Sequence, residues 1–285
     1  MTDVVSERTD PFEQSRAIEH DLMELAERHG LPAGDVVDSV LALLTTLSAQ
    51  PNAVFDEYPE YRRELAAPPA LALVDPPVTS THGFFDVVRS RASRRDFGTG
   101  PLDGPRLLAL LHWTFGVRGT TLAYDFRDTP LRFAPSAGGL ASIDAYVVTG
   151  AVDGLEPGSY YFDAEQGLIP LVEGIMLPKL AGLLAGQEWL SGANALVVLV
   201  SNTGRVKTKY GSMAPKLALL DAGVGLGHLE LVAAALELRA TILGGLPAGE
   251  LRKALRLPEP DRVPLASIAI GTRPGQGHGN GHSHG

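Results

Sequence analysis

Two arginines and a serine occur close together near residue 93 of this chain. Arg91, Ser93 and Arg95 lie within five residues and are followed by Phe97. A guanidinium group offers forked N–H donors, which suit a phosphate or the edge of an electron-rich ring. The same spacing is also typical of a solvated basic helix end, so both interpretations stay open from these residues alone.

Three later segments could bring backbone or basic groups against a flat, negatively charged ligand. Residues 135–140 have the sequence Pro-Ser-Ala-Gly-Gly-Leu, and Gly244 and Gly245 lie between an apolar run and a predicted helix start. Glycine allows a close backbone approach, and N–H groups at a helix start attract anions. Arg273 follows the last predicted strand and could neutralise a phosphate. Each segment by itself also fits an ordinary turn or loop.

Lys209 and Tyr210 form a candidate acid–base pair in the loop that is predicted after a buried strand. A lysine can remove a proton only when burial or a nearby cation lowers its pKa. The neighbouring phenol could donate a hydrogen bond to a substrate or relay the proton. Lys207 and Lys216 lie nearby in the sequence, so an exposed basic surface is the alternative interpretation.

Hydrophobic periodicity predicts a mixture of helices and strands in the second part of the chain. Helices are predicted at 84–91, 105–115, 178–184, 215–238 and 247–255, with glycines interrupting the fourth. Strands are predicted at 143–149, 160–162, 195–201 and 268–270, the first two forming a hairpin. Because helices and strands do not alternate regularly, the pattern favours an α+β fold over a doubly wound sheet.

The first 80 residues are predicted to form a helical N-terminal region and a connector. Apolar residues at helical spacing cover 13–30 and 35–49, and a proline-rich connector leads to a boundary near residue 80. The two helices fit a packing appendage or the extension of an interface. Residues 81–275 are expected to be the main domain, and the glycine- and histidine-rich residues 276–285 a disordered tail.

Composition argues against several classes of function. The 285 residues carry a net charge of −9, which argues against binding to nucleic acid or to an anionic membrane. The chain has no cysteine, so electrons for any redox chemistry must be carried by a bound cofactor. The tail histidines fix no coordination geometry, so no metal site is predicted. The polar N-terminus and short apolar runs predict a soluble, cytoplasmic protein without a membrane span.

The ordered set of these segments resembles the flavin-dependent nitroreductase superfamily. The pieces are Arg-x-Ser-x-Arg-x-Phe at 91–97, the 135–140 loop, Asp221 in a helical pattern, the Gly244-Gly245 turn and Ile270-Gly271-x-Arg273 at the end. The resemblance covers about residues 82–275. It implies an α+β fold with a central, mostly antiparallel sheet flanked by helices, and a domain-swapped homodimer that binds FMN at its interface.

The resemblance also implies a set of flavin contacts shared between two subunits. One subunit would supply the phosphate, ribityl and ring-edge contacts and the backbone near the reactive N5, and the second subunit would supply further ring contacts. The phosphate, ribityl and ring-edge contacts are expected from Arg91, Ser93, Arg95 and Arg273. The backbone near N5 is expected to be that of Gly244 and Gly245. The ring contacts of the second subunit are expected from Pro135, Ser136 and Ala137.

The 135–140 loop and the Pro-Gly-Ser-Tyr-Tyr-Phe-Asp segment at 157–163 are similar to the azoline dehydrogenase branch, which acts in ribosomal peptide modification. In that branch an adjacent Lys-Tyr pair is the catalytic dyad, and Lys209 and Tyr210 match it. Aromatising an azoline removes one hydride, which a flavin accepts, and one proton, which a general base must take. The implied function is FMN-dependent oxidation of thiazoline or oxazoline rings in a precursor peptide, with a cyclodehydratase as a further partner.

Two other functions fit the same residues. An NAD(P)H-dependent reductase of a nitro, enone or dehydroamino acid substrate would run the flavin in the opposite direction. A non-catalytic scaffold subunit of a peptide-modifying complex would need only the fold. Ala141 and Ser212, which depart from the residues usual in the azoline branch, leave room for the scaffold.

Overall fold

The computed structural model describes residues 65, 67–74, 77–123, 127–174, 176–184, 186–245, 247–257 and 262–275. Its strands are β1 (Leu71–Ala72), β2 (Val117–Ala123), β3 (Arg127–Arg132), β4 (Ile143–Thr149), β5 (Gly158–Asp163), β6 (Gly167–Glu173), β7 (Ala195–Asn202), β8 (Arg239–Leu243) and β9 (Arg262–Gly271). Its α-helices are α3 (Phe84–Ser90), α4 (Gly104–Phe115), α5 (Leu177–Gly182), α6 (Thr203–Tyr210), α7 (Ala214–Ala235) and α8 (Ala248–Ala254). Short 3-10 turns are η1 (Ala137–Gly139), η2 (Glu188–Gly192) and η3 (Gly211–Met213).

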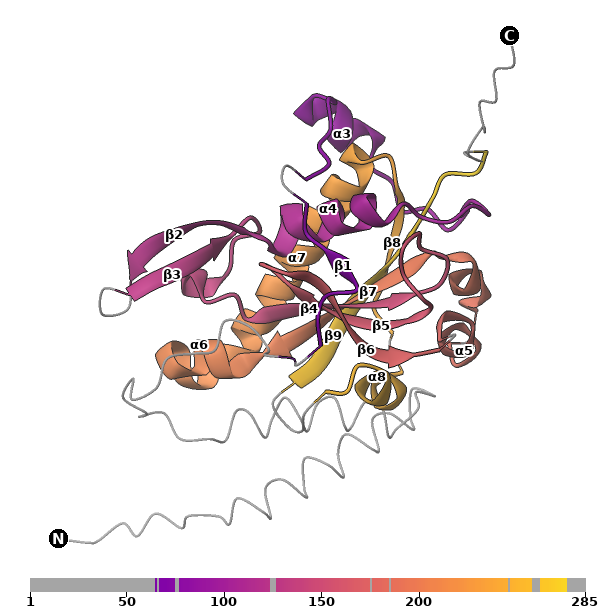
Figure 1. Cartoon of the computed structure of the whole chain (residues 1–285). Helices are drawn as coiled ribbons and strands as arrows, with labels where there is room; N and C mark the ends of the chain where they lie inside the picture. Colours follow the sequence, from indigo (N-terminus) through magenta and orange to yellow (C-terminus); the bar gives the residue numbers. More distant parts are fainter. Residues whose placement is uncertain are drawn as a thin grey trace, which may run out of the picture.

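Seven of these strands form one sheet in the order β1-β6-β5-β4-β7-β9-β8 (Figure 1). Each neighbouring pair in that order is antiparallel. The strands β2 and β3 form a separate antiparallel hairpin that projects from the body of the domain. The α+β fold with a mostly antiparallel sheet flanked by helices, which the sequence predicts, is therefore confirmed.

Helices cover both faces of the sheet, and successive residues of the central strands point to opposite faces. Val197 and Ile268 lie opposite each other in β7 and β9 and pack toward α4 and α7. Their neighbours Val198 and Ala269 face the other side, against α5 and α8. All four side chains are fully buried. The period of two along these strands therefore builds two separate apolar layers.

The sequence prediction of a glycine-interrupted helix at 215–238 is wrong, because α7 is continuous through Gly223, Gly225 and Gly227. A Cβ at Gly225 would lie 3.1 Å from the Phe115 ring of α4, so glycine there allows the two helices to pack closely. By length and composition alone, Gly211–Ala235 could cross a bilayer. In this domain α7 instead packs against α4, β7 and β9.

Other predicted elements differ from the structure in extent. The sequence pattern does not predict the β2–β3 hairpin. The predicted last strand, 268–270, covers three residues of β9. Part of the predicted connector is strand β1, which pairs with β6 at the edge of the sheet. The boundary near residue 80 stays a prediction. The helices predicted at 13–30 and 35–49 and the tail at 276–285 lie outside the described residues.

Candidate active site

A basic cleft lies where the segment after α3 runs beside β8 and the end of β9. It is lined by Ser90, Arg91, Ala92, Arg94, Glu230, Ala234, Leu238, Arg239, Ala240 and Arg273, and its volume, open mouth included, is about 350 Å³. We call it the arginine cleft. Backbone pairing holds the segment in place, because the Arg94 N–H donates to the Ala240 carbonyl at 2.8 Å and the Thr241 hydroxyl donates to the Arg94 carbonyl.

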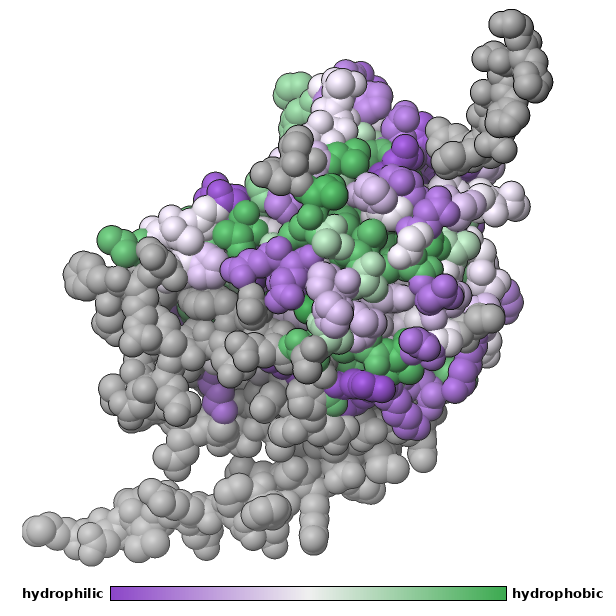
Figure 2. Space-filling view, viewed as in Figure 1, coloured by the Kyte–Doolittle hydropathy of each residue, from purple (hydrophilic) through white to green (hydrophobic). Residues whose placement is uncertain are grey.

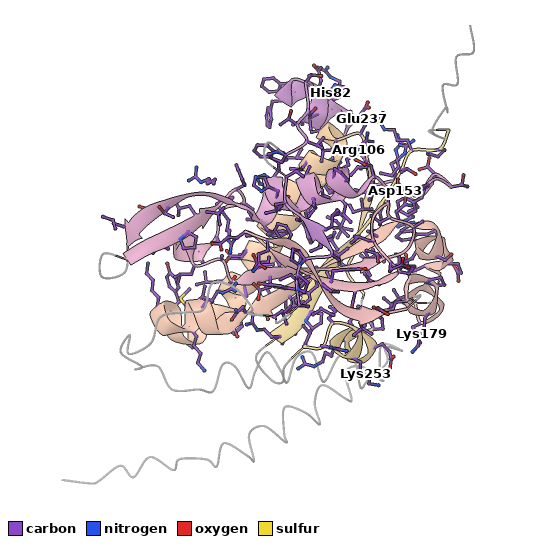
Figure 3. All side chains as sticks on the ribbon, in the orientation of Figure 1. His82, Arg106, Asp153, Lys179, Glu237 and Lys253 are labelled. Carbon is purple, nitrogen blue, oxygen red and sulfur yellow. The ribbon has the colours of Figure 1, made fainter. Side chains whose placement is uncertain are left out.

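Carboxylates pair with three of the four arginines: Glu230 of α7, Glu237 just beyond its end, and Asp96, which lies 3.5 Å from a terminal nitrogen of Arg239. Arg91 lies 3.4 Å from Glu230, and Arg273 lies 3.2 Å from Glu237. Glu237 also lies 3.6 Å from His82, and Figure 3 shows these two side chains close together beside α3. The Nε of Arg239 is buried and has no hydrogen-bond partner within the described part of the chain. An orphaned donor among four guanidinium groups fits an anion such as a phosphate.

Of the predicted flavin contacts, Arg91 and Arg273 line the arginine cleft and the others do not. Ser93 forms an isolated parallel bridge with Ala240 of β8, and its neighbour Arg94 lines the cleft instead. The Arg95 guanidinium lies over the Trp189 ring, 5.3 Å from its centroid. Gly244 and Gly245 follow β8, and a Cβ built at either position meets none of the described residues within 4 Å. The backbone there is open to a ligand.

The 135–140 loop turns through left-handed glycine positions and ends against a strained Ala141, and polar contacts hold it in place. Gly138, Gly139 and Ala141 have φ values of 61°, 70° and 49°, in the left-handed region that costs a non-glycine residue free energy. Asp221 of α7 accepts the Ala137 N–H at 2.9 Å, and Ser136 Oγ accepts the Ala141 N–H at 2.9 Å. The first bond fixes the loop against α7, and the second closes the loop on itself.

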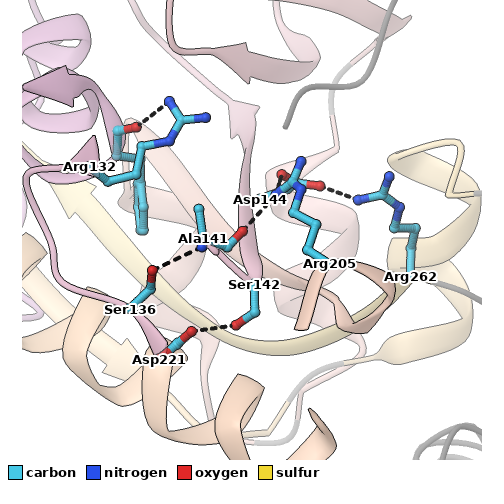
Figure 4. A network of polar contacts seen from close by, with 9 residues as sticks. Arg132, Ser136, Ala141, Ser142, Asp144, Arg205, Asp221 and Arg262 are labelled. Atoms are coloured by element: carbon cyan, nitrogen blue, oxygen red, sulfur yellow. Dashed lines mark hydrogen bonds and ion pairs between the residues drawn. The ribbon is translucent and has the colours of Figure 1, made fainter. Parts of the chain in front are cut away.

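Asp221 is itself buried and holds a second donor. Its other oxygen accepts the Ser142 hydroxyl at 2.6 Å (Figure 4). Burial raises the pKa of Asp221, while the hydrogen bonds from Ser142 and Ala137 act in the opposite direction. The loop residues Pro135 and Ser136 border a second cavity of about 470 Å³, open mouth included. That cavity is also lined by Phe115, Arg132, Ala134, Ala141, Ile143, Asp144, Ala145, Tyr161, Phe162, Ala164 and Asp221.

Lys209 and Tyr210 lie at the C-terminal end of α6, next to this loop. The prediction that they lie in a loop is wrong, because Thr203–Tyr210 is helical and ends at Gly211 with a φ of 53°. The Lys209 ammonium is 5.1 Å from the centroid of the Tyr210 ring. Tyr210 packs against Leu140 and Val206, whereas Lys209 is exposed. The structure therefore places Tyr210 beside the 135–140 loop, with the exposed Lys209 next to it in the helix.

The predicted site residues thus fall into two groups at different positions along α7. Asp221 holds the loop group, and Glu230 belongs to the arginine cleft. Nine helical residues span about 14 Å along the axis. The sequence pattern assigned no role to three residues of these groups, Arg94, Arg239 and Asp221. Only their place beside the quoted motifs could have suggested one.

Family and structural comparisons agree with this architecture. Residues 88–272 match the model of the Nitroreductase family. This match covers more than half of the chain, so the protein belongs to that family and is a nitroreductase-family oxidoreductase. No match is found among curated protein sequences.

Three solved structures illustrate the likeness. A Ralstonia eutropha protein designated a nitroreductase is 25% identical with a TM-score of 0.57, covering 74% of this chain and 95% of that one. One from Anabaena variabilis is 20% identical with a TM-score of 0.57, covering 82% and 46%. A chain of the E. coli microcin synthetase complex McbBCD, solved with truncated pro-MccB17 bound, is 17% identical with a TM-score of 0.53, covering 94% and 99%. At 20% and 17% identity, the last two matches show a shared fold.

Proposed function

We propose that this protein is an FMN-dependent dehydrogenase that oxidises thiazoline or oxazoline rings in a ribosomally made precursor peptide. The observation that carries the proposal is the pairing of two half-sites on one fold. One half-site is a cleft of arginines suited to a phosphate, and the other is a loop and a Lys-Tyr pair suited to a ring and a proton.

The arginine cleft fits the phosphate of FMN. Arg91 and Arg273 would hold it, together with Arg94 and the orphaned Nε of Arg239. The open backbone at Gly244 and Gly245 leaves room beside the ring. When bound, the flavin supplies a hydride acceptor, which a chain without cysteine lacks.

A homodimer would unite the two half-sites. A two-fold axis across α7 sets the N-terminal half of one copy against the C-terminal half of the other, so the 135–140 loop of one protomer meets the arginine cleft of its partner. The exposed face of α7 carries Leu219, Leu220 and Val224 at 48%, 57% and 42% exposure. An apolar face of this kind is typical of an interface.

A second exposed apolar group extends this interface toward α3. Phe84 and Phe85 are 66% and 77% exposed, and α3 packs against α7. Figure 2 shows hydrophobic surface in this part of the molecule. We therefore expect α3 to contact the partner protomer as well.

In this mechanism the chain's own residues handle the proton. Lys209 Nζ, which is exposed in the single chain, takes the proton from the ring carbon next to the carbonyl group once the bound substrate and the partner protomer bury it. The Tyr210 hydroxyl donates a hydrogen bond to the substrate. The ring loses this proton and a hydride, and becomes aromatic. A peptide substrate, a cyclodehydratase partner and a cytoplasmic location belong to the same proposal. Support comes from the nearly full-length fold match to a synthetase chain solved with a pro-peptide bound.

The test uses the purified full-length protein, reconstituted with FMN, and a synthetic peptide with one thiazoline ring. We expect flavin absorbance at one FMN per protomer, a dimer by light scattering, and a mass loss of about 2 Da from the peptide, equal to two hydrogens. Folded protein that cannot take up FMN would overturn the proposal. Rapid bleaching of the flavin by NAD(P)H without peptide oxidation would assign the reductase function instead.

A further inference from the structure

Arg205 is among the largest fully buried side chains of the described residues, with 1% of its side chain exposed. It lies on α6, one helical turn before Lys209. No sequence motif marked it, and the proton chemistry proposed above does not use it. A buried guanidinium is costly unless every charge and donor is matched, so its partners indicate what it does.

The partners of Arg205 connect three segments. One terminal nitrogen donates to the Ala141 carbonyl at 2.7 Å and to Asp144 Oδ1 at 2.7 Å (Figure 4). The Asn202 amide oxygen, turned toward the guanidinium, accepts from its Nε at 3.1 Å. Ala141 directly follows the 135–140 loop, Asp144 lies in β4, and Asn202 precedes α6. Arg205 therefore ties the start of α6 to the loop and to the sheet.

A second arginine provides an internal comparison. Arg262 of β9 pairs with the other oxygen of the same Asp144 carboxylate, with 12% of its side chain exposed. It makes no contact with Ala141 and does not belong to α6. Both arginines neutralise Asp144, and both donate to the turned Asn202 oxygen that precedes α6. Of the two, Arg205 alone lies on the helix that carries Lys209 and Tyr210 and also donates to the Ala141 carbonyl.

We propose that Arg205 is a positioning residue that locks α6 against the 135–140 loop and so holds Lys209 at the substrate ring. This inference rests on the proposed function. A buried ion pair adds little net stability compared with apolar packing, whereas its geometry is strict. The forked donors of arginine can satisfy Ala141, Asp144 and Asn202 together, which a lysine ammonium cannot do in the same plane.

The experiment compares Arg205→Lys with Arg262→Lys in the FMN-loaded full-length protein, using the synthetic thiazoline peptide. Both variants keep a cation beside Asp144, so both should keep FMN and a thermal transition near that of the wild type. We expect kcat of Arg205→Lys to fall about 30-fold with KM nearly unchanged, because only the transition-state geometry is lost. Arg262→Lys should stay within about threefold of the wild type.

Two further measurements separate positioning from a general loss of structure. Deuterium at the ring carbon that loses the proton should give a larger isotope effect on kcat in Arg205→Lys than in Arg262→Lys, since the proton step becomes slower. In a Lys209→Ala background, Arg205→Lys should cost almost nothing more, because both changes remove the same interaction. The inference would be overturned if Arg205→Lys and Arg262→Lys lowered kcat equally, or if Arg205→Lys left the isotope effect unchanged. It would also be overturned if the rate losses of Arg205→Lys and Lys209→Ala multiplied in the double variant.

The outcome for Lys209 separates this inference from the proposed function. If the FMN-loaded wild type does not oxidise the peptide, the proposed function fails and this inference fails with it. If Lys209→Ala oxidises the peptide at the full rate, ring oxidation stands, but the base role of Lys209 and the positioning role of Arg205 are both wrong. If Lys209→Ala is inactive and Arg205→Lys is fully active, the proposed function stands and the positioning role of Arg205 is wrong.

Discussion

The arginine cleft and the Asp144 network use the same residue types in opposite ways. In the cleft, the side chains of Arg91 and Arg273 are 40% and 36% exposed, and their carboxylate partners lie 3.2 to 3.4 Å away. In the network, Arg205 and Asp144 are 1% and 4% exposed and 2.7 Å apart. Exposed ion pairs are weak and can be exchanged for a ligand anion, whereas buried pairs hold one geometry. We therefore assign ligand binding to the first region and positioning to the second.

The sharpest test of this comparison is Lys209→Ala, which alters the loop side only. Loss of a general base typically costs about 10²–10⁴-fold in rate, so ring oxidation should fall by that factor while FMN stays bound. Tyr210→Phe should show a smaller loss in the same direction. Mass spectrometry of the peptide gives the rate, and flavin absorbance gives the occupancy. Lys207→Ala on the same helix is the control, and an equal loss there would remove Lys209 from its role.

Arg91→Ala tests the cleft side. Hydrogen bonds to charged groups are worth about 1.5–3 kcal/mol, so the Kd for FMN should rise about 10–100-fold, and Arg273→Ala should act similarly. Thermal stability should barely change, since these side chains are partly exposed. Fluorescence titration with FMN measures the Kd. Arg89→Ala is the matched control, because Arg89 is exposed and pairs with Asp86 outside the cleft.

Asp221→Asn tests whether the loop side depends on a buried carboxylate. Burial raises the pKa of Asp221, so the native state binds its proton more tightly than the unfolded chain does. Its contribution to the free energy of unfolding therefore falls as pH rises from the unfolded pKa, about 4, to the higher folded pKa. The substitution should remove this part of the pH dependence, which urea unfolding between pH 4 and 7 measures. If the free energy of unfolding changed with pH in the same way in the variant and the wild type, the raised pKa would not belong to Asp221.

Glu237→Gln should have the smallest effect. This carboxylate competes for Arg273, and an exposed pair of this kind is worth well under 1 kcal/mol, so FMN should bind about two- to threefold more tightly. Salt should reduce the gain, because it screens the pair in the wild type. Glu250→Gln, whose partners Lys179 and Lys253 lie near α5 and α8, is the control (Figure 3). Weaker FMN binding in Glu237→Gln would contradict the competition.

Some elements follow from the sequence because their pattern matches their final environment. Residues 195–201 are apolar and β-branched, and they form the fully buried β7. The apolar spacing and Pro105 predict α4, with Gly116 at its end. The β2–β3 hairpin is not predictable in this way, since Val117–Ala123 contains arginine, glycine and two threonines without apolar alternation. The α6 helix has no side-chain cap, so nothing local distinguishes it from a loop.

The sequence by itself determined which side chains this protein has for chemistry, and those elements whose pattern matches their surroundings, such as β7 and α4. Only the tertiary structure decided which arginine does what. Arg91 and Arg273 line a cleft, Arg95 lies over Trp189, and Arg205 is buried against Asp144. The physical reason is that the cost of burying a charge depends on its partner. The partner of Arg205 is 61 residues away in the chain, where no local pattern can reveal it.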